Sequence, residues 1–248
     1  MAKRAHPPAL PHGELHEVLP DIFFVTGTVR MPGPVPVSFS RNMTVVREGE
    51  RLVLINSLRL NDEGLKQLDA LGKVTDVVRI AAFHGMDDPF YKERYAAKVS
   101  VVKGQRYVSG FNVNAAETYL TPDTELDGQA SLPLSGARVH VLGGTPPEGM
   151  LLLEREGGVL VSGDCLQHWH TPDRYFSLVG RIALRAMGFI KPHNVGPAWL
   201  KQTKPPLADL LGLLDLPFDH VLPAHGSAVL GDAKAKYRPR LEALRGAG

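Results

Sequence analysis

Along the first third of the chain, apolar and β-branched residues form short runs separated by turn residues, a pattern typical of β-strands. Three such segments are 21–29, 42–57 and 73–83. Glu48-Gly49-Glu50 predicts a hairpin turn inside the second segment. Between the last two, segment 60–73 has leucines at helical spacing, with Asn61 as the predicted N-cap and Gly72 as the stop. This strand–helix–strand order predicts a crossover connection and a sheet covered on its faces.

The later part of the chain predicts more strands and then helices. Three short strands are expected at 137–144, 149–156 and 157–164. Segment 174–189 has helical spacing with interspersed arginines, and we expect it to pack on the core through its apolar face, to flank a pocket or to mediate dimerisation. Segment 205–229 predicts a leucine-rich helix, a strand that ends near Pro223 and a loop, and 232–246 predicts a polar closing helix.

The domain organisation follows from these patterns and from composition. The 248 residues are 44% hydrophobic and 22% charged, which is the balance of an ordinary soluble globular protein. No repeat, linker or low-complexity tract divides the chain, so we expect one domain over 16–248. Prolines and polar residues dominate 1–15, which predicts a flexible N-terminal arm.

Charge, cysteine content and hydropathy limit which classes of binding partner and which cellular compartment we expect. The net charge is +2 and no long basic block occurs, so no nucleic-acid partner is expected. Cys165 is the single cysteine, which excludes an intrachain disulfide and a Cys-X-X-Cys zinc ribbon. No apolar run reaches the roughly 20 residues of a membrane-spanning helix, and the N-terminus has no signal-peptide core. We therefore expect a cytoplasmic protein without a membrane partner, either a monomer or a homodimer.

Candidate metal ligands stand directly after three of the predicted strands. His84 follows segment 73–83 and is itself followed by Asp88, Asp164 ends segment 157–164, and His225 comes soon after Pro223. Each alone has an ordinary structural explanation, such as a hydrogen-bonded histidine, a helix cap or a turn. The carboxyl ends of strands converge on one rim of a sheet in α/β proteins, so together these residues predict one site.

The order of these landmarks resembles the metallo-β-lactamase fold, an αββα sandwich of metal-dependent hydrolases. The resemblance spans about residues 22–230. It rests on Asn42, "LVLINS" (52–57), "FHGMDD" (83–88) in the place of His-x-His-x-Asp-His, "VLGGTPPEGMLLL" (141–153) in the place of Gly-His-Thr-x-Gly, "LVSGDCL" (160–166) and "LPAHG" (222–226). The last two match closely. Within this family, the pattern resembles a divergent bacterial branch, which has a degenerate motif and an undefined reaction, more closely than it resembles the conventional members.

The departures from the family pattern lie at the metal positions. Met86, Pro89 and Gly144 stand where the family places histidines, so a conventional two-zinc site is not expected. The resemblance leaves four ligand positions, which are His84, Asp88, Asp164 and His225. Two imidazoles and two carboxylates suit one Zn²⁺, or Fe²⁺ or Mn²⁺, with a water in an open position. Asp88 or Asp164 would orient that water or accept its proton.

Two further histidines and two functions stay open. His168 and His170 lie two residues apart after Asp164, so an extended backbone would point both the same way, as substitute ligands or substrate contacts, or simply as surface histidines. One function is a hydrolase-like enzyme with a mononuclear metal site and an unidentified small substrate. The alternative is a non-catalytic ligand-binding or sensing protein that has lost its metals, since the fold alone does not choose between the two.

Overall fold

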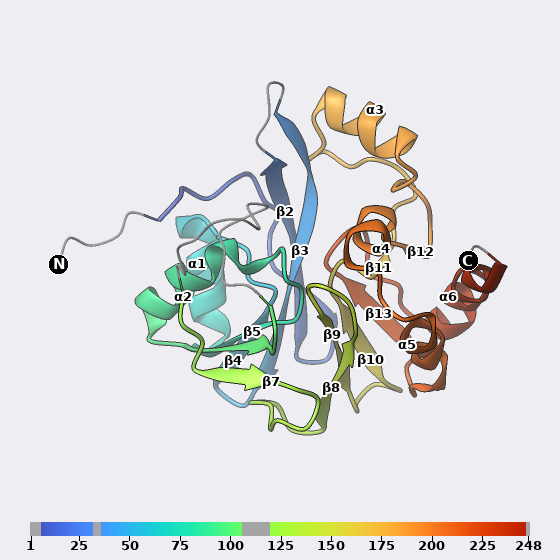
Figure 1. Ribbon diagram of the computed structural model, residues 1–248. Helices are drawn as coiled ribbons and strands as arrows, with labels where there is room; N and C mark the ends of the chain where they lie inside the picture. Colours follow the sequence, from blue (N-terminus) through green and yellow to red (C-terminus); the bar gives the residue numbers. More distant parts are fainter. Residues whose placement is uncertain (1–5, 32–35, 106–119, 247–248) are drawn as a thin grey trace.

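Two β-sheets pack face to face in the computed structural model, which describes residues 6–31, 36–105 and 120–246 (Figure 1). Within these residues the first sheet has the order β1-β2-β3-β4-β5-β6-β7, formed by β1 (His16–Leu19), β2 (Ile22–Met31), β3 (Val37–Glu48), β4 (Arg51–Ile55), β5 (Lys73–Arg79), β6 (Lys98–Val102) and β7 (Thr124–Leu126). Strands β1 to β4 are antiparallel neighbours, and β4 to β7 are parallel.

The second sheet is smaller and completes the sandwich. Its order is β13-β10-β9-β8, formed by β13 (His220–Pro223), β10 (Val159–Ser162), β9 (Glu148–Leu153) and β8 (Ala137–Leu142). A separate ribbon pairs β11 (Leu166–Gln167) with β12 (Asn194–Val195). Strands β10 and β13 run parallel, so the loops that follow them leave from the same edge of this sheet.

Helices cover the outer faces of both sheets (Figure 1). On the first sheet lie α1 (Asp62–Leu71) and α2 (Asp88–Tyr95), and on the second lie α4 (Pro197–Thr203), α5 (Leu207–Gly212) and α6 (Ala233–Glu242). Short 3₁₀ turns are η1 (Gly85–Asp87), η2 (Leu213–Asp215) and η3 (Ala243–Gly246). Helix α3 (Leu178–Ala186) stands apart, beside the far end of the long β2–β3 hairpin (Figure 1).

Side-chain alternation explains the layers. On β4, Leu52 and Leu54 pack against the α1 and α2 side, whereas Val53 and Ile55 face the second sheet. Because successive residues of a strand point to opposite faces, a strand covered on both sides is apolar at every position. On β10 the same rule places Leu160 under α4, α5 and α6. The result is the αββα sandwich that the sequence predicts.

Several local predictions are confirmed. Glu48 and Arg51 are cross-strand partners around the expected hairpin turn. The Asn61 side chain caps α1 by accepting a hydrogen bond from the Gly64 N–H (2.8 Å). The β4–α1–β5 unit is the expected crossover between parallel strands. Local capping and turn chemistry suffice for these elements, because each depends on residues a few positions apart.

Part of the predicted N-terminal arm is hydrogen-bonded to β2, and its flexibility stays a prediction. Residues 1–5 of the predicted flexible arm lie outside the described residues, but its later part runs along β2. There the Gly13 N–H donates to Thr26 O (2.8 Å) and the Thr28 N–H donates to Pro11 O (2.9 Å). The region after His84, in which the sequence predicts no helix, forms η1 and α2. In the described part of the chain, every helix is too short or too polar to span a bilayer.

Candidate metal centre

Three of the predicted ligands meet at one rim of the sandwich. His84 lies after β5, Asp164 after β10 and His225 after β13. The Nε2 atoms of His84 and His225 are 3.2 Å apart, and each lies near Asp164 Oδ1, at 3.4 and 3.1 Å respectively. All three residues are buried. Within the described ranges they are the group whose three ligand atoms lie close enough to hold one metal ion.

The tautomer of His225 makes this cluster short of hydrogen-bond donors. A backbone carbonyl can only accept, so the contact of His225 Nδ1 with Ser40 O (2.8 Å) requires the proton on Nδ1. In a neutral imidazole Nε2 is then an acceptor, and it faces the carboxylate oxygen of Asp164. Two acceptors at this distance repel each other unless a proton or a metal ion lies between them. A histidine with its outer nitrogen bonded to a carbonyl is the usual arrangement of a metal ligand.

The electrostatics favour the metal-binding protonation states. Burial lowers the pKa of His84, although the nearby Asp164 carboxylate opposes this shift. Burial alone would raise the pKa of Asp164, but the imidazoles of His84 and His225 outweigh it and hold that pKa below its usual range. A neutral imidazole and an ionised carboxylate are the forms that bind a cation. The donor set therefore fits a divalent metal ion.

A second buried acid lies behind the cluster. Glu148 accepts a hydrogen bond from the Cys165 N–H (2.7 Å), next to Asp164. Burial and the charge of Asp164 both raise the pKa of Glu148 well above its ordinary value. Both effects oppose a second negative charge beside Asp164. Cys165 is buried, as the sequence predicts.

Asp88 lies apart from these three residues, contrary to expectation. Its Oδ1 accepts a hydrogen bond from Ser57 Oγ (2.7 Å), its Oδ2 lies 3.8 Å from Arg79 Nη1, and the side chain is fully buried. The physical reason is that α2 begins at Asp88, with Pro89 in its first turn, which directs the carboxylate toward β5. The structure therefore brings together three of the four predicted ligands.

The cluster forms part of the wall of an apolar cavity of about 270 Å³. Its apolar lining comes from the β2–β3 hairpin, the loop after β5, and helices α3 and α4, and includes Met31, Phe39, Met86, Leu184, Met187 and Trp199. Besides the three candidate ligands, its polar lining is Arg41, Gln167 and Gln202. An apolar cavity with a few convergent polar groups is the usual form of a small-molecule site.

Several solved structures have the same architecture as this chain. VMB-1 superposes with a TM-score of 0.64 at 17% identity, covering 95% of this chain and 98% of its own. The metallo-β-lactamase DIM-1 superposes with a TM-score of 0.62 at 14% sequence identity, covering 99% of this chain and 100% of its own. The metallo-β-lactamase FIM-1 from Pseudomonas aeruginosa, in a mono-zinc form, superposes with a TM-score of 0.61 at 13% sequence identity, covering 97% of this chain and 99% of its own. The chain has the metallo-β-lactamase fold. Neither the protein-family models nor the curated proteins give a match.

Local packing leaves no room for a side chain at Gly144, one of the positions where the family pattern has a histidine. Gly144, which stands where the family pattern has a histidine, has a φ of +128°, and a Cβ there would lie 2.8 Å from the Thr203 carbonyl oxygen. Backbone of α4 therefore occupies the space that a side chain would need. Met86, in the place of another histidine, packs in the apolar cluster beneath α3. Both changes replace polar ligand positions by packing contacts.

His168 and His170 form a different group. The His168 ring lies 4.7 Å from the His170 ring and 4.4 Å from the His193 ring, measured between centroids. His168 Nδ1 accepts the His193 N–H (3.1 Å), so this nitrogen is already used. Within the described ranges, neither His168 nor His170 lines the cavity or belongs to the three-residue cluster. The structure thus gives them no place beside His84, and their role stays a prediction.

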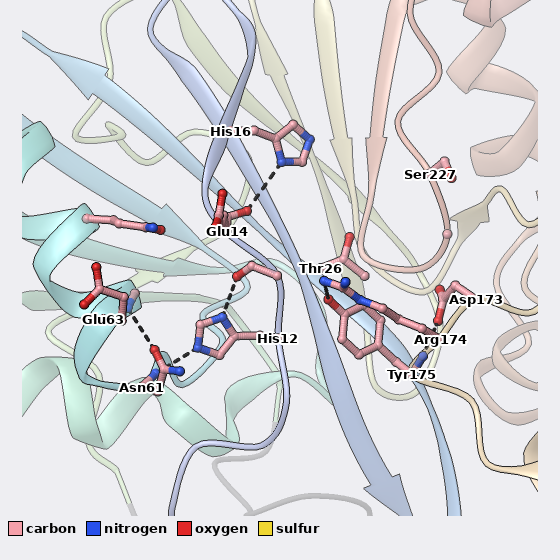
Figure 2. A pocket seen from close by; sticks show the side chains of 14 residues that line it. His12, Glu14, His16, Thr26, Asn61, Glu63, Asp173, Arg174, Tyr175 and Ser227 are labelled. Carbon is pink, nitrogen blue, oxygen red and sulfur yellow. Dashed lines mark hydrogen bonds between the residues drawn. The ribbon is translucent and has the colours of Figure 1, made fainter.

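A polar groove of about 930 Å³ lies elsewhere, between the segment before β1 and the start of α1 (Figure 2). Its lining includes acidic Glu14, Glu63 and Asp173. His12 there holds the chain in place, because its Nδ1 donates to Gly13 O (2.6 Å) and its Nε2 accepts the Asn61 N–H (2.9 Å) (Figure 2). The groove holds no group of three converging ligands among the described residues, so the apolar cavity is the better candidate site.

Sequence reasoning missed Arg41. This arginine lies on β3, is buried, and pairs with Asp87 while also lining the cavity. Its Nε has no hydrogen-bond partner among the described residues. In the sequence Arg41 stands between Ser40 and Asn42, just before the predicted strand at 42–57, so no local pattern marks it as buried. Charged residues are rarely buried without a partner or a function.

Proposed function

We propose that this protein is a metal-dependent hydrolase of a small, largely apolar substrate, with one Zn²⁺, or Fe²⁺ or Mn²⁺, held by His84, Asp164 and His225. The observation that carries the proposal is the convergence of three possible ligand atoms, within 3.1–3.4 Å of one another, in the wall of an apolar cavity. A bound divalent ion would polarise a substrate carbonyl and make an adjacent water more acidic. Two imidazoles and one carboxylate leave room for that water.

The chain's own residues would orient and deprotonate the water. Asp164 Oδ2 is buried and has no hydrogen-bond partner among the described residues, whereas its Oδ1 faces the two imidazoles. The free oxygen is the candidate to accept the proton of the attacking water. Asp88, the other predicted base, does not line the cavity and is bonded to Ser57 instead. We therefore assign the proton transfer to Asp164 alone.

Arg41 is the candidate to stabilise the negative charge that develops on the substrate. It lines the cavity, and its positive charge is close enough to His84 to contribute to the lowered pKa of that imidazole, after the larger effect of burial. A fixed donor in a water-poor site stabilises an oxyanion more strongly than water does. Its pairing with Asp87 holds the guanidinium in place.

The lining of the cavity supports an apolar substrate. Phe39, Leu184 and Trp199 are buried and present carbon surface to the space next to the cluster. A volume of about 270 Å³ suits a short acyl or aryl group rather than a large polar molecule. Esters and amides of such groups are therefore the substrate class that the cavity supports.

The alternative function, ligand binding without catalysis, has one observation in its favour. Asp88 is held by Ser57 and Arg79, and the Gly144 position is closed by Thr203, so the family's wider set of ligand positions is absent. A protein of this kind would bind a small apolar molecule in the same cavity without converting it. Both functions use one cavity, so one assay separates them.

The test compares metal-loaded with chelator-treated protein on a panel of aryl esters with short to medium acyl chains. We expect hydrolysis that requires the metal and is lost in His225→Ala. The matched control is His16→Ala, because His16 is an exposed histidine of the polar groove, outside the cavity. Saturable binding of unreactive ketone analogues, without turnover of any ester by protein shown to contain metal, would support the non-catalytic function instead.

A further inference from the structure

The outward face of α3 is unusually apolar for a surface helix. On α3, Leu178, Ile182 and Val179 are 74%, 66% and 41% exposed, and Met187, directly after the helix, is 56% exposed. In the described part of the chain these are four of the six large hydrophobic residues that are exposed, and they lie within ten consecutive positions. The sequence analysis allowed for a helix packed on the core, but the structure leaves these side chains uncovered. A concentrated exposed apolar patch marks an interaction surface.

The inner face of the same helix is already satisfied. Leu184 is buried, and Ala183, Leu184 and Met187 line the cavity. Gly180 lies so close to β3 that a Cβ there would collide with the carbonyl oxygen of Ser38. Helix α3 is thus fixed as a cover over the cavity, and the packing of the domain does not need the residues on its outer face.

Positive charge accompanies the apolar residues. Arg181 and Arg185 are exposed on α3, and the helix sequence LVGRIALRA contains no acid. Arg174 and Lys191 are exposed on the flanking segments. The nearest acid along the chain, Asp173, accepts the Tyr175 N–H (2.9 Å) through its side chain. The surface therefore combines apolar side chains with an excess of cationic groups.

We propose that the outer face of α3 docks on an anionic lipid surface. Leu178 and Ile182, with Val179 beside them, would enter the boundary between headgroups and acyl chains, while Arg181 and Arg185 contact lipid phosphates or carboxylates. Helices that lie in the membrane interface have this combination of an apolar face and cationic residues. The position of α3 at the edge of the molecule leaves the face accessible (Figure 1). The proposal departs from the expectation of a protein without a membrane partner, and the experiment below decides between the two.

A lipid surface fits this face better than a second copy of the chain. In a symmetric dimer the same patch meets itself, so Arg181 and Arg185 would approach the equivalent arginines without an acid on the helix to neutralise them. The 9 residues of α3 also span only about 13.5 Å, which is short for an interface that buries about 800 Å² on each partner. Shallow insertion into lipid needs only a few apolar side chains.

The docking surface is continuous with the cavity. Met187, directly after α3, lines the cavity and is also 56% exposed, so it joins the cavity to the surface around α3. A protein docked through α3 would hold the cavity next to the apolar layer of the membrane. Docking itself does not depend on hydrolysis, and its test uses no activity assay.

The experiment is co-sedimentation with vesicles of phosphatidylcholine alone and of equal parts phosphatidylcholine and phosphatidylserine. We expect binding to the mixed vesicles only, and weaker binding at high salt. The double variant Leu178→Ser/Ile182→Ser should lose this binding, and Arg181→Glu/Arg185→Glu should weaken it about tenfold or more. The matched control is Leu207→Ser/Leu230→Ser, which changes the two exposed leucines that lie outside α3.

Because the substituted side chains are exposed, we expect the thermal unfolding of all variants to match the wild type, which would show that they fold. Equal sedimentation with both vesicle types, no sedimentation with either, or wild-type binding by the two α3 variants would overturn the proposal. Size-exclusion chromatography adds a further outcome. A dimer that dissociates in Ile182→Ser would identify the face as an interface between copies, which would also overturn the lipid proposal.

Discussion

Two groups of histidine side chains lie on adjacent backbone in this protein and differ in what surrounds them. In the first, the rings of His84 and His225 are 4.9 Å apart, and Asp164 approaches both Nε2 atoms. In the second, His168 packs against His193 and His170, with no carboxylate hydrogen-bonded to the three rings among the described contacts. The backbone connects the groups, because the His168 N–H donates to His225 O (3.1 Å).

The difference shows what turns neighbouring imidazoles into a metal site. In the first group a carbonyl fixes the proton on His225 Nδ1 and an acid adds negative charge, so several acceptors converge. In the second, burial together with the neighbouring His193 and His170 lowers the pKa of His168 to about 4. The second group has three rings against two in the first, but no converging set of ligand atoms within the described ranges. The acid and the fixed tautomer matter more than the number of histidines.

The largest expected effect comes from removing the acid of the first group. Asp164→Ala should weaken Zn²⁺ binding by more than about 100-fold, because changes even in the residues that orient ligands cost 10–100-fold. Competition of the protein with a chromogenic chelator measures this affinity. Asp88→Ala is the matched control, since Asp88 is a buried acid that contacts Ser57 rather than the cluster. Equal loss in both variants would show that Asp88 belongs to the site after all.

A smaller effect concerns the second group and pH. Folded His168 has a pKa of about 4, below the ordinary 6.5, so between these values the unfolded chain binds a proton that the folded chain does not. Metal-free protein should therefore lose stability as pH falls from about 6.5 to about 4, by on the order of 1 kcal/mol from this residue. Chemical denaturation at several pH values should show a shallower loss in His168→Asn, which keeps an acceptor for the His193 N–H. An identical slope in both proteins would contradict the lowered pKa of His168.

The smallest effect is expected from the exposed member of the second group. His170→Ala should leave Zn²⁺ affinity within about twofold of wild type, because the His170 side chain lies outside the cluster. The same chelator competition measures it. A loss comparable to that of Asp164→Ala would instead make His170 a substitute ligand, as one of the sequence-based alternatives allowed.

How far the sequence predicts the structure depends on how local the causes are. The β4–α1–β5 unit and the cap at Asn61 depend on neighbouring residues, so they could be predicted. The meeting of His84, Asp164 and His225 could also be predicted, because each follows a strand and strand ends converge. The position of Asp88 could not, because it depends on where α2 begins and on its contacts with Ser57 and Arg79.

The position of α3 over the cavity could not be predicted from the sequence either. A segment such as 178–186 shows an amphipathic spacing, but spacing alone does not tell which face other elements cover. Contacts from the β2–β3 hairpin, far away in the sequence, decide that Leu184 is buried and Ile182 is exposed. Arg41 shows the same limit, since its pairing with Asp87 joins residues 46 positions apart.

Metal content tests the central claim most directly. Wild-type protein and His225→Ala are reconstituted with Zn²⁺, Fe²⁺ or Mn²⁺, freed of loosely bound ions, and analysed by mass spectrometry for metal per chain. Three converging ligand atoms in a buried site predict about one equivalent in the wild type and less than about a tenth of an equivalent in the variant. Less than about a tenth of an equivalent of every metal in the wild type, or equal metal in both proteins, would contradict the claim that His84, Asp164 and His225 form a metal centre.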